Sequence, residues 1–381
     1  MSSDPAPGTT AEAPVPARAR TTRSGAQRIA HAFGWTARFV LALFLFVGAL
    51  QVMKTGAGNL SILQGEGWLV RNAGSTFGLG WVGALFVLSG SPIAASALTL
   101  VAAGSITETE GFTMLTGSRL GAAFVVLLVA VVYALRGGEG KRMAPVSTAV
   151  MALSTTALVY APGAVIGYAL LRWEPFRAVD VTFPAQFTDL IDVVYGGMLA
   201  RIETWNAGLL FVGGLGILLL AFKLIDTVVP EMSQESIESS RLGWLRKKWP
   251  MFGLGCLVAL VTMSVSVALT VLVPLVAKGY VKREDIVPYI MGANITTLGD
   301  TLLAGLALHS PGAVRIVVAQ VISTTILSVL VLWLRYWETR KVIWRFQNWV
   351  VKPGAHVRMA AFTASLFAVP LALILIGGLA G

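Results

Sequence analysis

Long apolar runs, separated by short polar connections, make up most of this chain. About nine of these runs have the length that crosses a bilayer core of roughly 30 Å. They lie near residues 36–53, 78–103, 112–135, 144–171, 205–229, 252–277, 287–308, 314–337 and 362–380. This pattern predicts an all-α polytopic membrane protein, with the lipid bilayer as its surroundings.

Polar motifs interrupt four of these runs in a regular order. Ser89-Gly90-Ser91 breaks the second run, and Ser264-Val265-Ser266 breaks the sixth. The stretch 117–122 opens the third run, and the stretch 292–297 opens the seventh. Corresponding residues of the two sets are 175 positions apart, so the copies align without a gap. The spacing predicts an internal repeat.

The composition supports a membrane protein and argues against nucleic-acid binding. Of the residues, 56% are hydrophobic and 13% are charged, and the mean hydropathy is +0.76. Soluble domains carry roughly 25% charged residues. The formal charge of +10 comes from basic residues that gather in loops beside apolar runs. Because the positive-inside rule accounts for this distribution, we expect no nucleic-acid partner.

Motifs for enzyme chemistry are missing from the sequence. Cys256 is the only cysteine, which excludes a disulfide framework and a thiolate metal cluster. The chain has no HExxH, P-loop or GxSxG motif and no cluster of His and Cys. We therefore expect a protein that is not an enzyme, without a resident cofactor or metal.

Loop charge predicts how the runs are oriented in a cell membrane. The arginine-containing segment 1–34 is expected to be a disordered, uncleaved cytoplasmic tail. Three further basic connections are expected inside, at residues 136–142, 246–248 and 335–358. The linker 173–204 carries more acidic than basic residues and is expected outside.

These orientations conflict if every run crosses the membrane. They agree if the second run returns as a re-entrant hairpin, since Gly90 and Pro92 weaken a helix there. The sixth run would do the same from the cytoplasmic side. The prediction is two inverted-topology repeats, each with about three crossing helices and one hairpin. The repeats are 35–172 and 205–337, followed by a basic cytoplasmic loop at 338–361 and a C-terminal transmembrane helix at 362–381 that ends outside.

The Ser-x-Ser motifs offer hydroxyl groups beside backbone carbonyls that a helix break leaves free. Such a cluster can bind a cation such as sodium through its oxygens, or an oxyanion through hydroxyl and amide groups. Serine in a membrane helix can also bond to its own backbone or allow close helix packing. The recurrence of the motif in register favours a binding site.

The second motif of each copy adds further candidates. Asn294, Thr296 and Thr297 would present donors and acceptors to an anion, or would simply cap a helix. Arg119, which follows Ser118, occupies in the first copy the position of Asn294 in the second. Its guanidinium would either pair with a phosphate-like anion or extend to the outer membrane surface.

Asp300 is the costliest residue for its position in an apolar run. A carboxylate at the bilayer centre costs about 2.5–3.5 kcal/mol on insertion scales. A cation ligand, a proton carrier or a structural partner such as Arg315 would account for it. Glu108 and Glu110 lie in a short connection and are expected to be solvated.

These motifs resemble those of the sodium/phosphate cotransporter family. Each of that family's two inverted repeats has a Gln-Ser-Ser-Ser stretch followed by a Gly-Ala-Asn-Ile-Gly-Thr-Thr-like stretch. The stretches that correspond here are 88–91 and 263–266, 117–122 and 292–297, and, for the repeat-opening helices, 43–48 and 210–213. The resemblance covers roughly residues 39–335 and is stronger in the second repeat. Leu88 and Met263 replace the glutamine, and Gly90 and Val265 replace the middle serine.

The resemblance implies a bacterial-type plasma-membrane secondary transporter that moves an inorganic anion, phosphate, with sodium as the coupling ion. The residues expected at the substrate and ion site are Ser89, Ser91, Ser118, Arg119, Ser264, Ser266, Asn294, Thr296, Thr297 and Asp300. Two alternatives stay open. One is a transporter of another anion or an organic solute, coupled to protons, and the other is a non-transporting scaffold or sensor that kept the fold.

Overall fold

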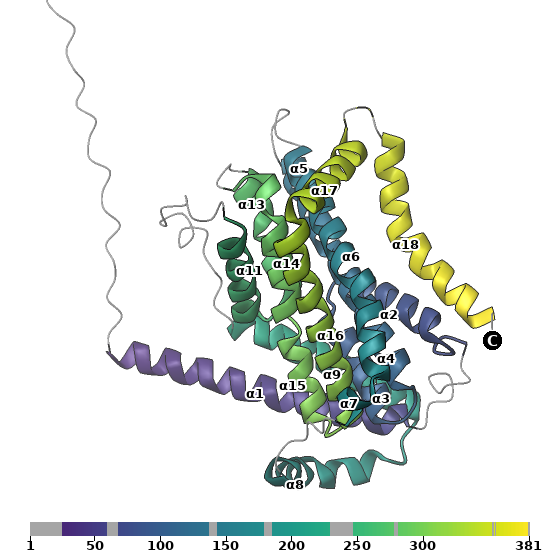
Figure 1. The fold of residues 1–381 in the computed structure, drawn as a ribbon. Coiled ribbons are helices and arrows are strands. Elements are labelled where there is room, and N and C mark those ends of the chain that lie inside the picture. The colour runs from purple at the N-terminus through teal and green to yellow at the C-terminus, as the bar shows by residue number, and fades with distance from the viewer. Residues whose placement is uncertain are drawn as a thin grey trace, which may run out of the picture.

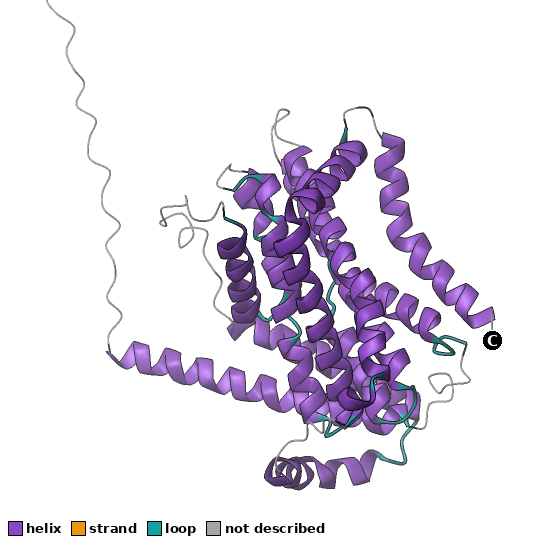
Figure 2. Cartoon of the chain, in the orientation of Figure 1, coloured by secondary structure: helices purple, strands orange, loops and turns teal. Residues whose placement is uncertain are grey.

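The computed structural model describes residues 25–58, 68–136, 143–178, 185–228, 247–277, 281–352, 354 and 356–379. The described residues form helices and no strand, so the predicted all-α fold is confirmed (Figure 2). The helices are α1 (Gly25–Ala57), α2 (Ala73–Val87), α3 (Ser91–Ala102), α4 (Glu108–Ala122), α5 (Phe124–Arg136), α6 (Met143–Arg172), α7 (Glu174–Arg177), α8 (Ala185–Ile202), α9 (Ala207–Val228), α11 (Lys248–Thr262), α12 (Val265–Thr270), α13 (Leu272–Ala277), η3 (Arg283–Asp285), α14 (Val287–Thr296), α15 (Gly299–Ala307), α16 (Pro311–Leu330), η4 (Val331–Arg335), α17 (Tyr336–Val351) and α18 (His356–Leu379).

Six of the described helical stretches are long and apolar enough to cross a membrane. They are Phe33–Ala57, Glu108–Leu135, Met143–Arg172, Ala207–Ile225, Pro311–Val351 and His356–Leu379. The second and sixth apolar runs of the sequence instead form shorter helices, α2 and α3 in one case and α11 to α13 in the other. The seventh run is also divided, because α14 ends at Thr296 and α15 begins at Gly299.

Both Ser-x-Ser motifs lie at helix breaks, and both breaks begin with a left-handed residue. α2 ends at Val87 and is followed by Leu88, whose φ of 56° lies in the left-handed region. α11 ends at Thr262 and is followed by Met263, with a φ of 46°. A left-handed residue with a side chain costs about 1–2 kcal/mol and cannot continue a right-handed helix. The left-handed residue therefore ends each helix immediately before the motif.

Glycines bring two pairs of helices into backbone contact, α2 with α4 and α11 with α14. A Cβ at Gly80 would overlap the carbonyl oxygen of Met114, and a Cβ at Gly255 would overlap that of Tyr289. Gly117 lies in the same way against Phe77, and Gly292 against Phe252. In each of these comparisons the two halves use residues that are 175 positions apart. The two helix pairs therefore pack by corresponding contacts.

One corresponding position differs in a way that preserves the contact. Gly121 of α4 lies against the carbonyl oxygen of Trp81 in α2, where a Cβ would overlap it. Thr296 of α14 has a side chain at this position, and its Oγ1 donates a hydrogen bond of 2.8 Å to the carbonyl oxygen of Cys256. A hydroxyl group in the second half thus replaces the bare backbone contact of the first.

The residues outside the two predicted repeats are more helical than expected. The segment 338–361, expected as a basic loop, is instead mostly helix, with α17 continuing α16 through the π-helical turn η4 and with α18 beginning at His356. α17 lies at the top end of the molecule in Figure 1. Ile343 and Val350 are buried on one side of it, while Lys341 and Arg345 are exposed on the other. The many charged residues of this segment indicated a loop. They instead occupy the exposed side of an amphipathic helix, which can carry as many charges as a loop.

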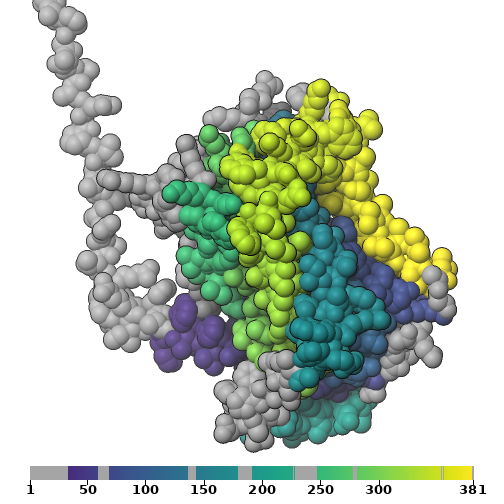
Figure 3. Space-filling view, viewed as in Figure 1, coloured from purple at the N-terminus to yellow at the C-terminus, as the bar shows by residue number. Residues whose placement is uncertain are grey.

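Two other expected loops also contain helix. The linker 173–204 includes α7 and α8, and the expected tail 1–34 includes the start of α1, since that helix begins at Gly25. Residues 1–24 of the tail lie outside the described part of the chain. The C-terminal helix α18 packs along α2, where Asn72 Nδ2 donates a 2.6 Å hydrogen bond to the carbonyl oxygen of Gly377. Figure 3 shows this yellow helix along one edge of the molecule.

Candidate functional site

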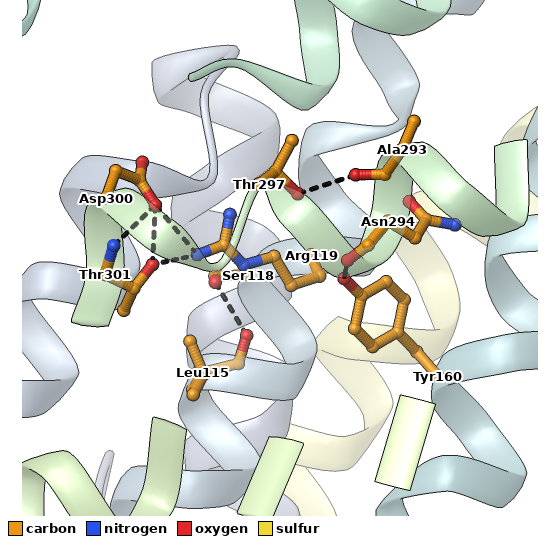
Figure 4. A network of polar contacts seen from close by, with 9 residues as sticks. All are labelled: Leu115, Ser118, Arg119, Tyr160, Ala293, Asn294, Thr297, Asp300 and Thr301. Atoms are coloured by element: carbon orange, nitrogen blue, oxygen red, sulfur yellow. Dashed lines mark hydrogen bonds and ion pairs between the residues drawn. The ribbon is translucent and has the colours of Figure 1, made fainter. Parts of the chain in front are cut away.

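A buried ion pair joins the two halves of the chain. Arg119 of α4 and Asp300 of α15 are 1% and 4% exposed, and Arg119 Nη2 lies 3.7 Å from Asp300 Oδ1 (Figure 4). Thr301 links the two side chains. Its hydroxyl accepts a hydrogen bond from Arg119 Nη2 and donates one of 2.9 Å to Asp300 Oδ1, to which its backbone N–H also donates at 2.5 Å. In every other ion pair of the described residues, at least one side chain is clearly more exposed.

Three buried polar atoms around this pair have no hydrogen-bond partner. They are Arg119 Nε, Asp300 Oδ2 and Asn294 Oδ1. A buried polar atom without a partner costs about 1–3 kcal/mol, and more when the group is charged. The site therefore has an unused donor on a cation, an unused acceptor on an anion and an unused amide oxygen, which ligands or water can satisfy.

Asp300 also faces a cavity of about 70 Å³. The other residues that line it are apolar, namely Phe39, Leu43, Phe46, Phe222, Ile225, Met263 and Leu303. They come from α1, α9, α15 and the break after α11. Among the described residues that line the cavity, Asp300 is thus the only charged one, and the left-handed Met263 of the second break lies on the same cavity.

Asn294 is held against α6 rather than against the ion pair. Its Nδ2 donates to Thr156 Oγ1 at 3.2 Å, and its backbone oxygen accepts a 2.6 Å hydrogen bond from the hydroxyl of Tyr160. Figure 4 shows Tyr160 and Asn294 together on one side of Arg119, with Asp300 and Thr301 on the other. The sequence did not single out Thr156, Tyr160 or Thr301. Of these three residues, only Thr301 could have been found from the sequence, because it directly follows Asp300.

Removing the hydroxyl of Tyr160 tests its hydrogen bond to α14. We expect Tyr160→Phe to lower the free energy of unfolding by about 1 kcal/mol, because a buried carbonyl loses its donor. The measurement is denaturant unfolding of the purified protein in mixed micelles. Tyr133→Phe, on an exposed position of α5, is the matched control and should leave stability unchanged. Equal stability of both variants and the wild type would contradict this contact.

The other expected site residues have more ordinary surroundings. Ser118 Oγ donates to the carbonyl oxygen of Leu115 at 2.7 Å, and Thr297 Oγ1 to that of Ala293 at 3.1 Å. Thr296 Oγ1 donates to the carbonyl oxygen of Cys256, so all three hydroxyls donate to backbone carbonyls. The stretches 117–122 and 292–297 were expected at the starts of helices, but they lie at the C-terminal ends of α4 and α14, so these residues do not cap a helix start. The remaining lone pairs of the hydroxyls are still available as acceptors.

Each Ser-x-Ser motif lies beside one part of the site, the first next to α4 and the second next to Met263 on the cavity wall. Ser91 is buried, while Ser89, Ser264 and Ser266 are half-buried. The first break lies beside α4, since a Cβ at Gly90 would be 3.0 Å from the carbonyl oxygen of Ser118. Ser264 caps α12 by accepting a 3.3 Å hydrogen bond from the N–H of Val267. No hydrogen bond among the described residues joins the serines of one motif to those of the other.

Two expectations about charged residues require correction. Arg315 does not pair with Asp300. Its Nη1 lies 2.6 Å from Glu108 Oε1, so Glu108 is also not the solvated residue that was expected. Glu110 closes a capping box at the start of α4, where its carboxylate accepts a 2.8 Å hydrogen bond from the N–H of Thr107. Side chains in a short connection were expected to be solvated, but here α16 packs near the start of α4 and brings Arg315 to Glu108.

Comparison with known proteins adds no assignment. No family model, curated protein or solved structure matches the chain. The functional interpretation therefore rests on the sequence motifs and on the geometry described above.

Proposed function

We propose that this protein is a secondary active transporter that moves inorganic phosphate with sodium across the plasma membrane. In this proposal the two halves are inverted-topology repeats, the N-terminus is cytoplasmic, and the site lies between the halves. The observation that carries the proposal is the correspondence of the two helix breaks. Both follow a left-handed residue, both contain Ser-x-Ser, and both adjoin a helix pair packed through corresponding glycines.

Broken helices inside an apolar fold need a reason. Unwound backbone exposes polar groups that lipid cannot satisfy, so it persists in a membrane only where protein or an aqueous cavity receives it. Secondary transporters use such breaks near the bilayer midplane to bind substrates and ions between two repeats. The buried charges of Arg119 and Asp300 beside the breaks support the same interpretation, because ionisable residues in membrane helices usually mark ion pathways.

The side chains suit an oxyanion and a small cation. A guanidinium is the preferred side chain for phosphate, and its Nε–H is unused here. Sodium binds through carboxylate, hydroxyl and carbonyl oxygens, which Asp300 and the second break can supply. The proposed site comprises Arg119 and Asp300, with Ser89, Ser91, Ser118, Ser264, Ser266, Asn294, Thr296 and Thr297 around them.

Uptake by proteoliposomes tests the proposal. We expect an inward sodium gradient to drive accumulation of labelled phosphate, and we expect dissipation of that gradient to abolish it. Ser264→Ala combined with Asn294→Ala should reduce the uptake rate, about 10-fold or more if both contact ligand. Ser365→Ala is the matched control, because Ser365 bonds only within α18. Absence of sodium-stimulated phosphate flux in either direction would remove this function.

A second candidate keeps the transporter fold but uses protons and a different solute. The cavity beside Asp300 favours it, since an otherwise apolar wall offers sodium few oxygen ligands, and carboxyl groups in membrane helices serve as proton carriers. The same proteoliposomes distinguish the candidates. An imposed pH gradient without sodium would drive solute uptake only in the second case.

A further inference from the structure

Arg119 and Asp300 bind each other through one side of each group and leave the other side open. The contact uses Arg119 Nη2 and Asp300 Oδ1, while Arg119 Nε and Asp300 Oδ2 are buried without partners. A structural ion pair of this depth normally has its remaining donors and acceptors satisfied, because an unsatisfied half-network costs more than an apolar core. Here an open donor is on the cation and an open acceptor is on the anion.

Electrostatics restricts what can fill the two open positions. The pair has no net charge, which is why both groups can stay ionised away from water. An anion that binds to Arg119 alone would leave the buried site with net negative charge. A cation that binds to Asp300 alone would leave it positive. One monovalent anion, such as dihydrogen phosphate, and one monovalent cation bound together keep the site neutral and satisfy both open atoms.

The backbone groups near Asp300 suit a cation, and those near Arg119 suit an anion. Asp300 shares its cavity with Met263, the residue that ends α11. The last carbonyls of a helix have no partner inside it and carry partial negative charge, which suits a cation. Arg119 lies in the other half, where the first break approaches the backbone at Ser118. That break leads into the first N–H groups of α3, whose partial positive charge suits an anion.

We propose that Arg119 and Asp300 form a coupling pair, on which an oxyanion binds to Arg119 Nε–H only together with a monovalent cation on Asp300 Oδ2. This inference rests on the proposed function and gives it a coupling mechanism. Each ion makes the binding of the other more favourable, and by linkage the two effects are equal. Neither ion alone is transported, because neither alone leaves the buried site neutral.

The test measures binding of inorganic phosphate and of sodium to the full chain in detergent by titration calorimetry. In the wild type, sodium should tighten phosphate binding about tenfold or more relative to choline, and phosphate should tighten sodium binding by the same factor. Asp300→Asn should bind phosphate without any dependence on sodium, since Arg119 is then unpaired. Arg119→Gln should bind sodium without any dependence on phosphate.

The control variant is Glu108→Gln, which removes an ion pair between α4 and α16 without touching the coupling pair. It should keep the wild-type coupling factor. If a single variant does not fold, the neutral double variant Arg119→Gln/Asp300→Asn should fold and should lose measurable binding of both ions, because it has neither the guanidinium nor the carboxylate.

The outcomes separate the two proposals. Phosphate binding that remains sodium-dependent in Asp300→Asn or in the double variant would overturn the coupling pair and leave the transporter proposal intact. A folded wild type that binds neither phosphate nor sodium would overturn the proposed function itself and the coupling pair with it.

Discussion

Gly255→Ala is expected to lower the free energy of unfolding by about 3 kcal/mol, the upper range for forcing an extra carbon into a packed interface. The added Cβ would overlap the carbonyl oxygen of Tyr289, which belongs to the backbone of α14 and cannot rotate away. The two helices must therefore separate. Unfolding in denaturing mixed micelles measures the loss. The variant should also be expressed at a lower level than the wild type.

The control for this variant lies in the same helix. Gly253 of α11 is exposed and has no atom within 4 Å of an added Cβ. Gly253→Ala should therefore stabilise slightly, by up to about 1 kcal/mol, because alanine favours helix over glycine. Similar effects of the two substitutions would show that helix propensity decides the result and that the contact with α14 does not.

The second large effect concerns the stability of the buried pair. Arg119→Gln and Asp300→Asn are each expected to cost about 3–5 kcal/mol, because each leaves one buried charge without its counter-ion. The double variant should cost much less than the sum of the single variants, since no unpaired charge remains. A double-mutant cycle of unfolding free energies gives the coupling energy directly.

An exposed pair provides the comparison for this cycle. Arg335 and Glu338 form a salt bridge with side chains 69% and 66% exposed. Such pairs contribute about 0–1 kcal/mol, because water competes for both partners. The cycle Arg335→Gln with Glu338→Gln should therefore show little coupling. Additive costs for Arg119 and Asp300 as well would contradict a mutually neutralising pair.

The sequence predicted the features that depend on local composition. Runs of apolar residues long enough for a bilayer predicted the all-α membrane fold, and Gly90 and Pro92 predicted the first break. The 175-residue register predicted an internal repeat, and the glycine contacts of the two helix pairs recur with the same spacing. Repeated glycines indicate close approach, but the sequence does not tell which backbone they approach.

Contacts between distant segments were less predictable. Alignment of the repeats placed Arg119 opposite Asn294, whereas the side chain of Arg119 reaches Asp300, which lies beyond the break between α14 and α15. The structural partner that the sequence suggested for Asp300 was Arg315, not Arg119. The pairing is decided by how α4, α15 and α16 pack together, and hydrophobic periodicity contains no information on that. Tyr160 was missed for the same reason.

The glycine contacts have a mechanical consequence. Where two backbones touch without intervening side chains, the helices cannot slide past each other, because a small shift brings carbonyl oxygens into collision. The pair α2 and α4, and the pair α11 and α14, should therefore each move as one rigid unit. Any relative displacement has to be taken up by the backbone next to these helix pairs, which is irregular at Leu88, at Met263 and between α14 and α15. Shape changes in this protein should accordingly be rotations of whole helix pairs about these breaks.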